Sequence, residues 1–295
     1  MAKILLCEPL ELFNLLNQRC RVNRLSEINF LCLFDARKVQ AFNMSHIITA
    51  RSMKVDSEGK FLLPESVEVE SMQHVVVYDG NTSSLQQQGK AMACARVLAN
   101  ETIYPVHILK GGFERFSALY SFLRTEKILY TIRELEKLKS YPVEILAGML
   151  YMGDEEQGLD PEVYRDLKIK AVISISESSN MESMDRNQSI FYIPVADTGH
   201  SDLYSRFDKI CSFIDAYINM RACVLIVSKQ GRSRCSAVSI AFLMHHHGYT
   251  LEDAWRYMLK CKPSMRPNTG FIEQLSQWEL QLRGEKLTNI SELDL

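Results

Sequence analysis

Short apolar segments alternate with amphipathic segments along most of this chain. The apolar segments have the length and the β-branched content of buried strands, and they span residues 30–37, 75–79, 106–109, 167–175, 191–197 and 224–227. The helical segments span residues 8–21, 85–98, 204–220 and 251–260, and residues 237–244 predict a further helix that is apolar throughout. Strands that alternate with helices predict an α/β fold with mainly parallel sheets covered by helices.

A charged segment separates two such regions. Residues 126–140 alternate acidic and basic side chains, which predicts a partly helical, solvated linker, and Tyr141-Pro142 is a plausible domain boundary. The residues after Gly284 are rich in Glu, Ser and Asp, so we expect a loosely ordered tail. The predicted organisation is therefore a first domain over 1–125, a linker over 126–140, a second domain over 141–283 and a tail over 284–295.

Composition narrows the class of protein. The chain has 295 residues, 46% hydrophobic and 24% charged, with a formal net charge of −2, as expected for a soluble globular protein of about two domains. This charge balance argues against direct binding of nucleic acid or of a membrane surface, and no apolar run reaches transmembrane length. Glu8 and Glu11 argue against a secretory signal, and they weaken a mitochondrial presequence without excluding it. The eight cysteines are scattered without a CxxC pair, which predicts buried, reduced thiols in an intracellular protein.

The apolar strand 224–227 leads into the most informative stretch, which runs Ser228-Lys229-Gln230-Gly231-Arg232-Ser233-Arg234. An apolar helix follows this loop. A strand, a tight turn at Gly231 and a helix N-terminus direct several backbone N–H groups at one point, where an anion is favoured. Arg234 can add a two-pronged donor for phosphate or sulfate, or it can pin its own loop. We therefore predict a phosphate-binding cradle made of Ser228, Lys229, Gln230, Gly231, Arg232, Ser233 and Arg234.

This stretch resembles the HCxxGxxR loop of protein tyrosine and dual-specificity phosphatases, in which the Cys thiolate attacks phosphorus. Aligned on Gly231 and Arg234, the position of the His is Val227 and that of the Cys is Ser228. A serine hydroxyl ionises far less readily than a thiol, and the sequence places no base beside it. The resemblance therefore implies a pseudophosphatase, with no catalytic residue and a degenerate nucleophile position at Ser228.

Other segments of the second half match the same family in the same order. Leu150-Tyr151-Met152-Gly153 resembles its first strand, and the run from Pro267 to Leu275 resembles the end of its catalytic domain. Asp197 lies 31 positions before Ser228, where the family has its general acid. We expect Asp197 to be a vestigial acid that orders its loop, and Ser233 to be a hydrogen-bond donor within the cradle.

The first half resembles a rhodanese-like domain. The resemblance rests on a strand ending Asp35-Ala36-Arg37, on the turn at His46-Ile47, and on a strand followed by Gly111-Gly112-Phe113. Sulfurtransferases of that fold carry a Cys after the central strand, whereas this chain has Asp79, which cannot hold a persulfide. The resemblance thus implies an inactive domain with Asp79 at the degenerate position.

An inactive rhodanese-like domain followed by an inactive phosphatase domain is similar to the serine/threonine/tyrosine-interacting-like pseudophosphatases. The resemblance implies regulation by binding to phosphorylated or signalling proteins, without a cofactor. It also implies links to an RNA-binding stress-granule factor, to MAP-kinase signalling and to a mitochondrial phosphatase involved in apoptosis, in the cytoplasm or alternatively in mitochondria. Two alternatives stay open, namely a vestigial cradle whose outer surfaces form a scaffold, and weak residual phosphatase activity.

One further motif is the run His245-His246-His247 near the end of the helix after the cradle. Consecutive helical residues point in different directions, so one metal ion cannot readily use all three imidazoles. We therefore predict no metal site and interpret the run as a histidine cluster at a helix C-terminus, beside Gly248.

Overall fold

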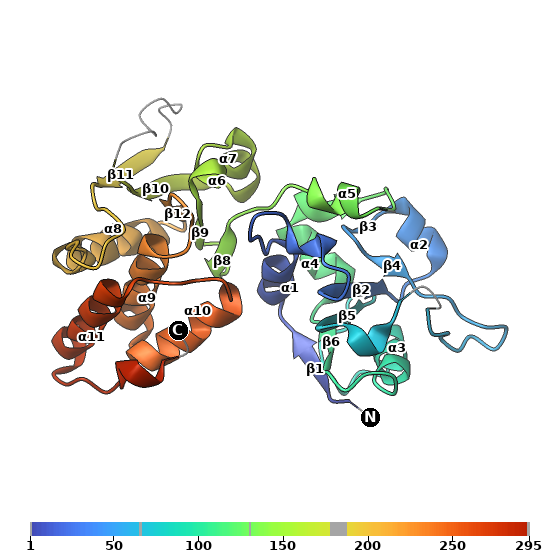
Figure 1. The fold of residues 1–295 in the computed structure, drawn as a ribbon. Helices are drawn as coiled ribbons and strands as arrows, with labels where there is room; N and C mark the ends of the chain where they lie inside the picture. Colours follow the sequence, from blue (N-terminus) through green and yellow to red (C-terminus); the bar gives the residue numbers. More distant parts are fainter. Residues whose placement is uncertain (1, 65–66, 130, 178–187, 294–295) are drawn as a thin grey trace. The chain divides into compact units, whose positions relative to one another are not determined.

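The computed structural model describes residues 2–64, 67–129, 131–177 and 188–293. The chain divides into two compact units, Met1–Ser140 and Tyr141–Leu295, each with its own sheet (Figure 1). Within the described residues, no helix combines the length and the apolar content needed to cross a bilayer.

The first unit is built on a parallel sheet in the order β1-β6-β5-β2-β4. Strands β2, β5 and β6 confirm the predicted strands, whereas the edge strand β1 was not predicted. A separate antiparallel pair joins β3 to β7. The strand bounds are β1 Ile4–Cys7, β2 Leu31–Asp35, β3 His46–Ile47, β4 Arg51–Ser52, β5 His74–Tyr78, β6 Val106–Leu109 and β7 Arg124–Thr125.

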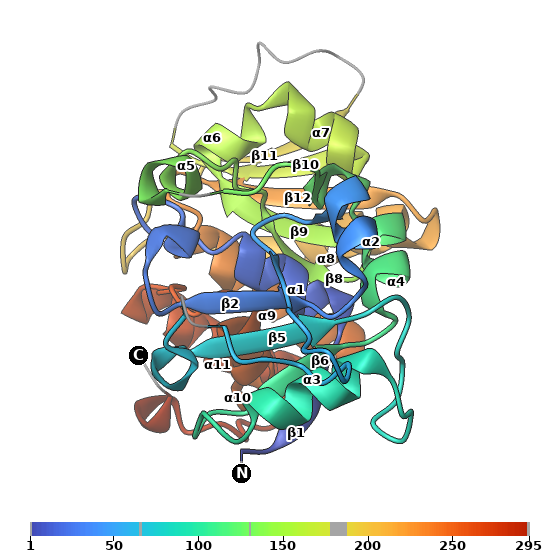
Figure 2. The same cartoon turned by 90° about the vertical axis from the view of Figure 1, so that its right-hand side faces the viewer.

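Helices cover both faces of this sheet. Helix α3 lies on one face, and α1 and α4 lie on the other, where Phe13 stacks on Tyr120 (Figures 1 and 2). The helices of the first unit are α1 Pro9–Leu16, α2 Val39–Met44, α3 Lys90–Leu98, α4 Gly112–Leu119 and α5 Ile132–Glu136, with short 3₁₀ turns η1 Arg24–Ser26, η2 Val69–Ser71 and η3 Ser121–Leu123.

The segment predicted as a linker, 126–140, groups with the first unit. Helix α5 packs near η1, and a capping box between Thr131 and Glu134 begins it. His46 contacts the backbone oxygen of Lys127 at 3.1 Å, which fixes the start of the segment.

The second unit has a mixed sheet in the order β11-β10-β12-β9-β8. The first four strands are parallel, and β8 is an antiparallel edge that the sequence pattern did not reveal. Strands β10, β11 and β12 confirm the predicted apolar strands. Their bounds are β8 Val143–Leu146, β9 Leu150–Asp154, β10 Ile169–Ile175, β11 Ser189–Ile193 and β12 Cys223–Ser228.

Helix α9 is the centre of this unit. It is buried at every position from Arg234 to Met244, as expected for a helix that is apolar around its whole circumference, and it packs against α8, α10 and α11. Helices α6 and α7 lie on the opposite face of the sheet (Figure 1). The bounds are α6 Glu155–Gly158, α7 Pro161–Leu167, α8 Phe207–Asn219, α9 Arg234–His247, α10 Leu251–Cys261 and α11 Thr269–Arg283, with 3₁₀ turns η5 Tyr204–Arg206 and η6 Ile290–Glu292.

Most residues after Gly284 are exposed, and the tail is held to the second unit at two points up to Leu293. Thr288 and Leu293 are buried. The reason is Glu279, a fully buried carboxylate on α11 that accepts hydrogen bonds from the backbone N–H groups of Leu287 and Thr288. A charge at that depth needs donors, and the tail supplies them.

Candidate anion-binding site

Strand β12 delivers the predicted cradle at the carboxyl end of the parallel strands. Its last residue, Ser228, pairs in register with Asp154 on β9 and with Ile175 on β10. This edge is the position where open α/β sheets bind ligands, because several loops converge there. Ser228 is buried, with 4% of its surface exposed.

The turn after β12 requires glycine at position 231. Gly231 has φ +61, and its N–H donates to the Ser228 carbonyl at 3.0 Å. A Cβ at this position would lie 2.9 Å from backbone atoms of Gly153 and Asp154. Both the left-handed conformation and the lack of space exclude larger residues.

Arg234 opens α9 and is nearly buried, at 5% exposure. Its Nη1 donates to the Val195 carbonyl at 2.9 Å, so one end of the guanidinium pins the loop between β11 and α8. Its Nε is buried and makes no hydrogen bond with the described residues, and it lies 3.9 Å from Oδ2 of Asp197. The side chain thus keeps a donor unused at the N-terminus of a helix.

Asp197 lies beside the cradle in a loop held to α11. Its Oδ1 accepts hydrogen bonds from Ser233 Oγ at 2.6 Å and from Asn268 Nδ2 at 2.8 Å. Asn268 also caps α11 by accepting from the N–H of Phe271. Gln274, one turn further, accepts from the N–H groups of Leu203 and Tyr204 and so fixes the far end of the same loop.

These groups enclose a cavity of about 440 Å³. Of the predicted residues, Asp197 and all of the cradle except Gly231 line it, whereas Val227 is buried against Gly158 and does not. The sequence did not single out three lining residues, Glu177, Arg266 and Asn268, because they come from other loops. The full lining is Glu177, Asp197, Ser228, Lys229, Gln230, Arg232, Ser233, Arg234, Arg266 and Asn268.

The charge of the cavity suits an anion with two negative charges. Four of the lining residues are cationic and two are acidic, which leaves an excess of two positive charges. The N-terminus of α9 adds a further partial positive charge. The arrangement can hold a tetrahedral oxyanion.

The position of the nucleophile carries a hydroxyl. The Ser228 hydroxyl interacts with the thiol of Cys235, the second residue of α9. Burial raises the pKa of Cys235, while its hydrogen bond with Ser228 acts in the opposite direction. None of the described residues that line the cavity is a histidine, so Ser228 has no imidazole base in it.

In the first unit, Asp79 has a structural environment. Its carboxylate accepts hydrogen bonds from the N–H groups of Asn81, Thr82 and Ala91 and from the Thr82 hydroxyl, at 2.7 to 3.2 Å. The Ala91 contact places the carboxylate at the N-terminus of α3, where negative charge is favoured. Asp79 therefore folds the loop that precedes α3.

His245 and His246 both contact Asp215 of α8, at 2.9 and 3.1 Å. Over the ranges that the structure describes, no group of three or more ligating side chains gathers around a point suited to a metal ion.

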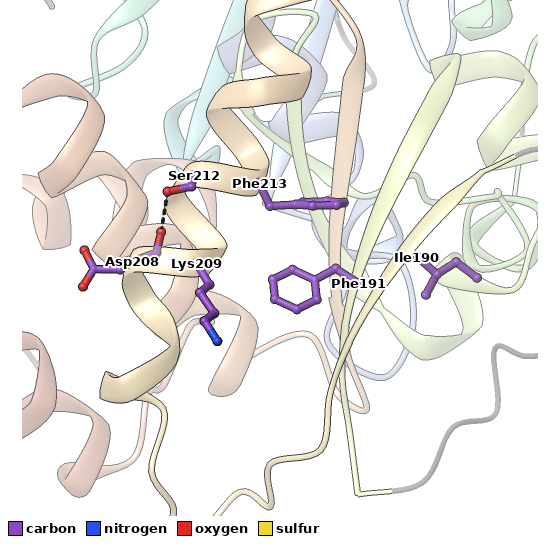
Figure 3. A pocket seen from close by; sticks show the side chains of 6 residues that line it. All are labelled: Ile190, Phe191, Asp208, Lys209, Ser212 and Phe213. Atoms are coloured by element: carbon purple, nitrogen blue, oxygen red, sulfur yellow. Dashed lines mark hydrogen bonds between the residues drawn. The ribbon is translucent and has the colours of Figure 1, made fainter.

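A second hollow, of about 520 Å³, lies between β11 and α8 (Figure 3). Phe191 and Phe213 form much of its lining, with Lys209 and Asp208 beside them. It combines apolar surface with the opposite, exposed charges of Asp208 and Lys209.

Comparisons with known proteins agree with this architecture. Residues 150–281 match the model of the dual specificity phosphatase catalytic domain, and residues 20–119 match the model of the rhodanese-like domain. The chain is 24% identical over 275 residues to dual specificity protein phosphatase 16 of Homo sapiens, covering 86% of this chain and 41% of that protein. It is 32% identical over 143 residues to dual specificity protein phosphatase Mpk3 of Drosophila melanogaster, covering 48% of this chain and 35% of that protein.

The chain therefore spans less than half the length of these two relatives. Among solved structures, the human tyrosine phosphatase-like serine/threonine/tyrosine-interacting protein aligns with a TM-score of 0.43 and 26% identity, over 47% of this chain and 95% of that one. On the two family models, the first unit carries a rhodanese-like parallel sheet, and the second unit carries a sheet that resembles dual specificity phosphatases and is flanked by helices.

Proposed function

We propose that this chain is a pseudophosphatase of the MK-STYX type, which binds phosphorylated proteins and does not hydrolyse them. The observation that carries the proposal is the hydroxyl of Ser228 at the end of β12, where a phosphatase needs a thiolate. Val227 supports it, because an apolar side chain at the position of the His cannot assist ionisation.

The binding half of the proposal rests on charge. A thiolate would repel a phosphate dianion, and a neutral hydroxyl does not. The unused Nε of Arg234, the cations of the cavity and the α9 N-terminus favour the dianion. A protein that holds a phosphoryl group without cleaving it can shield that group or compete for it.

We also propose a cellular role, which is regulation through protein partners. By resemblance, the partners are signalling proteins, including an RNA-binding stress-granule factor and a mitochondrial phosphatase. The proposed location is the cytoplasm, with mitochondria as the alternative.

A second candidate function has an observation of its own. Arg234 uses Nη1 on the Val195 carbonyl, and Asp197 faces its Nε. If the guanidinium serves only to pin its loop, the cradle is vestigial and the outer surfaces act as a scaffold.

Isothermal titration with a phosphotyrosine peptide separates the two candidates. The proposal expects binding by the wild type and a loss of about tenfold or more in Arg234→Ala, because a charge-assisted, bidentate contact is removed. Arg256→Ala, on the exposed surface of α10, is the matched control for loss of one positive charge. Equal affinity of all three proteins would favour the scaffold, and steady turnover of an aryl phosphate by the wild type would overturn both candidates.

A further inference from the structure

Strand β11 forms an open edge of the sheet in the second unit. It pairs with β10 on one side, and none of the described strands pairs with its other side. The N–H of Ser176 donates to the Ile193 carbonyl at 3.2 Å, so the backbone groups of Ile193 face β10. Because these groups alternate in direction along a strand, Ile190 and Tyr192 direct their N–H and C=O groups to the open side. The edge thus offers donors and acceptors to another strand.

This edge lacks the features that usually protect an exposed strand. Natural proteins blunt such edges with charged side chains, with proline or with a covering segment. Strand β11 has the sequence Ser-Ile-Phe-Tyr-Ile and contains neither a charge nor a proline. The opposite edge of the sheet differs, because β8 contains Glu144 and the Tyr257 hydroxyl of α10 donates to the Ile145 carbonyl at 2.7 Å. The open edge of β11 is therefore suited to binding a further strand.

The hollow beside this edge provides an apolar place for a side chain. Phe191 of β11 and Phe213 of α8 lie side by side in its lining, with ring centroids 5.2 Å apart (Figure 3). Both residues are only partly buried, and Ile190 in the same lining exposes 42% of its surface. A strand added to β11 would project every second side chain toward α8, where a large apolar residue can cover the two rings.

The charge at the hollow is complementary to a carboxylate. Lys209 is exposed in its lining and forms no ion pair with any described residue. The neighbouring acid, Asp208, already accepts a hydrogen bond from Gln281 at 3.2 Å. Side chains two positions apart share one face of a strand, so a carboxylate two residues from the apolar side chain would lie on the side of Lys209.

We propose that the open edge of β11 and the hollow against α8 bind an extended, unphosphorylated segment of a partner protein, which adds to the five-stranded sheet as a further strand. The segment carries a large apolar residue for the hollow, with a glutamate or aspartate two positions away for Lys209. Main-chain hydrogen bonds provide affinity in this mode, and the side-chain contacts provide selectivity. The inference is independent of the proposed function, because the hollow shares no lining residue with the cavity at the cradle.

The test measures the binding of labelled peptides to the full chain by fluorescence polarisation. The parent probe has about nine residues, mostly serine and threonine, with a central phenylalanine and a glutamate two positions to either side. Two further probes carry N-methyl groups on alternate amides, one at the odd and one at the even positions. We expect one methylated probe to bind within about twofold of the parent and the other to lose about tenfold or more, because only alternate amides face the sheet.

Variants of the chain test the edge and the charge separately. Ile190→Pro removes an outward N–H without removing a hydrogen bond to β10, so affinity should fall about tenfold, whereas Ile190→Val should stay within about twofold of the wild type. Lys209→Glu should weaken the parent probe about fivefold and should prefer a probe with lysines in place of the glutamates. Lys260→Glu, at an exposed position of α10, is the matched control for the charge change and should behave as the wild type does.

Thermal unfolding checks that each variant is folded, and the surface change Lys209→Glu keeps the test decisive if Ile190→Pro is unstable. Equal binding of the two methylated probes would overturn the inference, as would failure of the wild type to bind the parent probe. Displacement of the probe by inorganic phosphate would place it at the cradle and also overturn the inference. Dimers of the wild type in analytical ultracentrifugation that Ile190→Pro abolishes would assign the edge to a second copy of the chain instead.

Discussion

Ser233 donates a hydrogen bond of 2.6 Å from its hydroxyl to Oδ1 of Asp197. The same hydroxyl oxygen accepts from the N–H of Asn268 at 3.2 Å. One small side chain therefore joins the cradle, the loop after β11 and the start of α11. This geometry supports the interpretation of Asp197 as a residue that orders its loop.

Ser233→Ala should lower the free energy of unfolding by about 1 kcal/mol, because it removes a hydrogen bond to a half-exposed carboxylate. Asp197→Asn and the double variant complete a double-mutant cycle, with an expected coupling energy of about 0.5–1.5 kcal/mol. Urea unfolding measures all four proteins. A coupling energy near zero would mean that solvent replaces the contact without cost.

The double variant Val227→His with Ser228→Cys should acquire turnover of an aryl phosphate, about a hundredfold above the wild type. The reason is that Asp197, Gly231 and Arg234 already have their positions around the loop. Phosphate release measures it, with Ser228→Cys alone as the control that lacks the histidine. A folded double variant without activity would show that the loop is wrongly aligned with the family.

The same variant should be sensitive to oxidation. The side chain at position 228 interacts with Cys235 in the wild type, so a thiol introduced there gains a thiol neighbour. Hydrogen peroxide should inactivate the variant, and dithiothreitol should restore it. Adding Cys235→Ala removes the neighbouring thiol. If dithiothreitol restores the activity equally with and without Cys235→Ala, no disulfide forms between the two sulfurs.

Acidic pH should destabilise the first unit through two histidines. Burial lowers the pKa of His74, and the charges of His107 and Arg24 act in the same direction; burial also lowers the pKa of His107. The unfolded chain, with histidine pKa values near 6.5, therefore binds more protons than the folded chain as pH falls. The stability linked to these groups is complete above that value and is lost as pH falls through the lower, folded pKa values.

Urea unfolding at about pH 7.5 and about pH 5 measures this loss. The variant His74→Gln with His107→Gln should lose less stability between the two values than the wild type. His200→Gln, at an exposed position of the second unit, is the control and should behave as the wild type does. An unchanged difference in the double variant would assign the acid sensitivity to other groups.

Sequence patterns predicted the buried strands well, because a short continuous apolar run is typical of a strand that is buried on both faces. They missed the edge strand β1, where partly exposed residues give a weak pattern, and the edge strand β8, which is only four residues long and contains the buried Glu144. They found the cradle because its residues are consecutive. They did not find Glu177, Arg266 and Asn268, since periodicity shows which residues are buried but not which loops converge. Likewise, the sequence predicted Asp79 only as a residue that cannot hold a persulfide. It did not show that the Asp79 carboxylate accepts hydrogen bonds from the following loop and from the start of α3, because the positions of those donors depend on the fold.

Glu279→Gln should destabilise the second unit by about 3 kcal/mol. The carboxylate is fully buried, and it accepts from the N–H groups of Leu251, Leu287 and Thr288 and from the Thr288 hydroxyl, at 2.8 to 3.0 Å. The side-chain amide of glutamine would point its own N–H groups at some of these N–H and O–H donors, so those hydrogen bonds would be lost. Urea unfolding measures the loss, and faster tryptic cleavage after the exposed Lys286 should accompany it, because the tail loses its anchor. Glu273→Gln, at an exposed position of the same helix, should change neither quantity. If both variants behave alike, the attachment of the tail does not depend on this carboxylate.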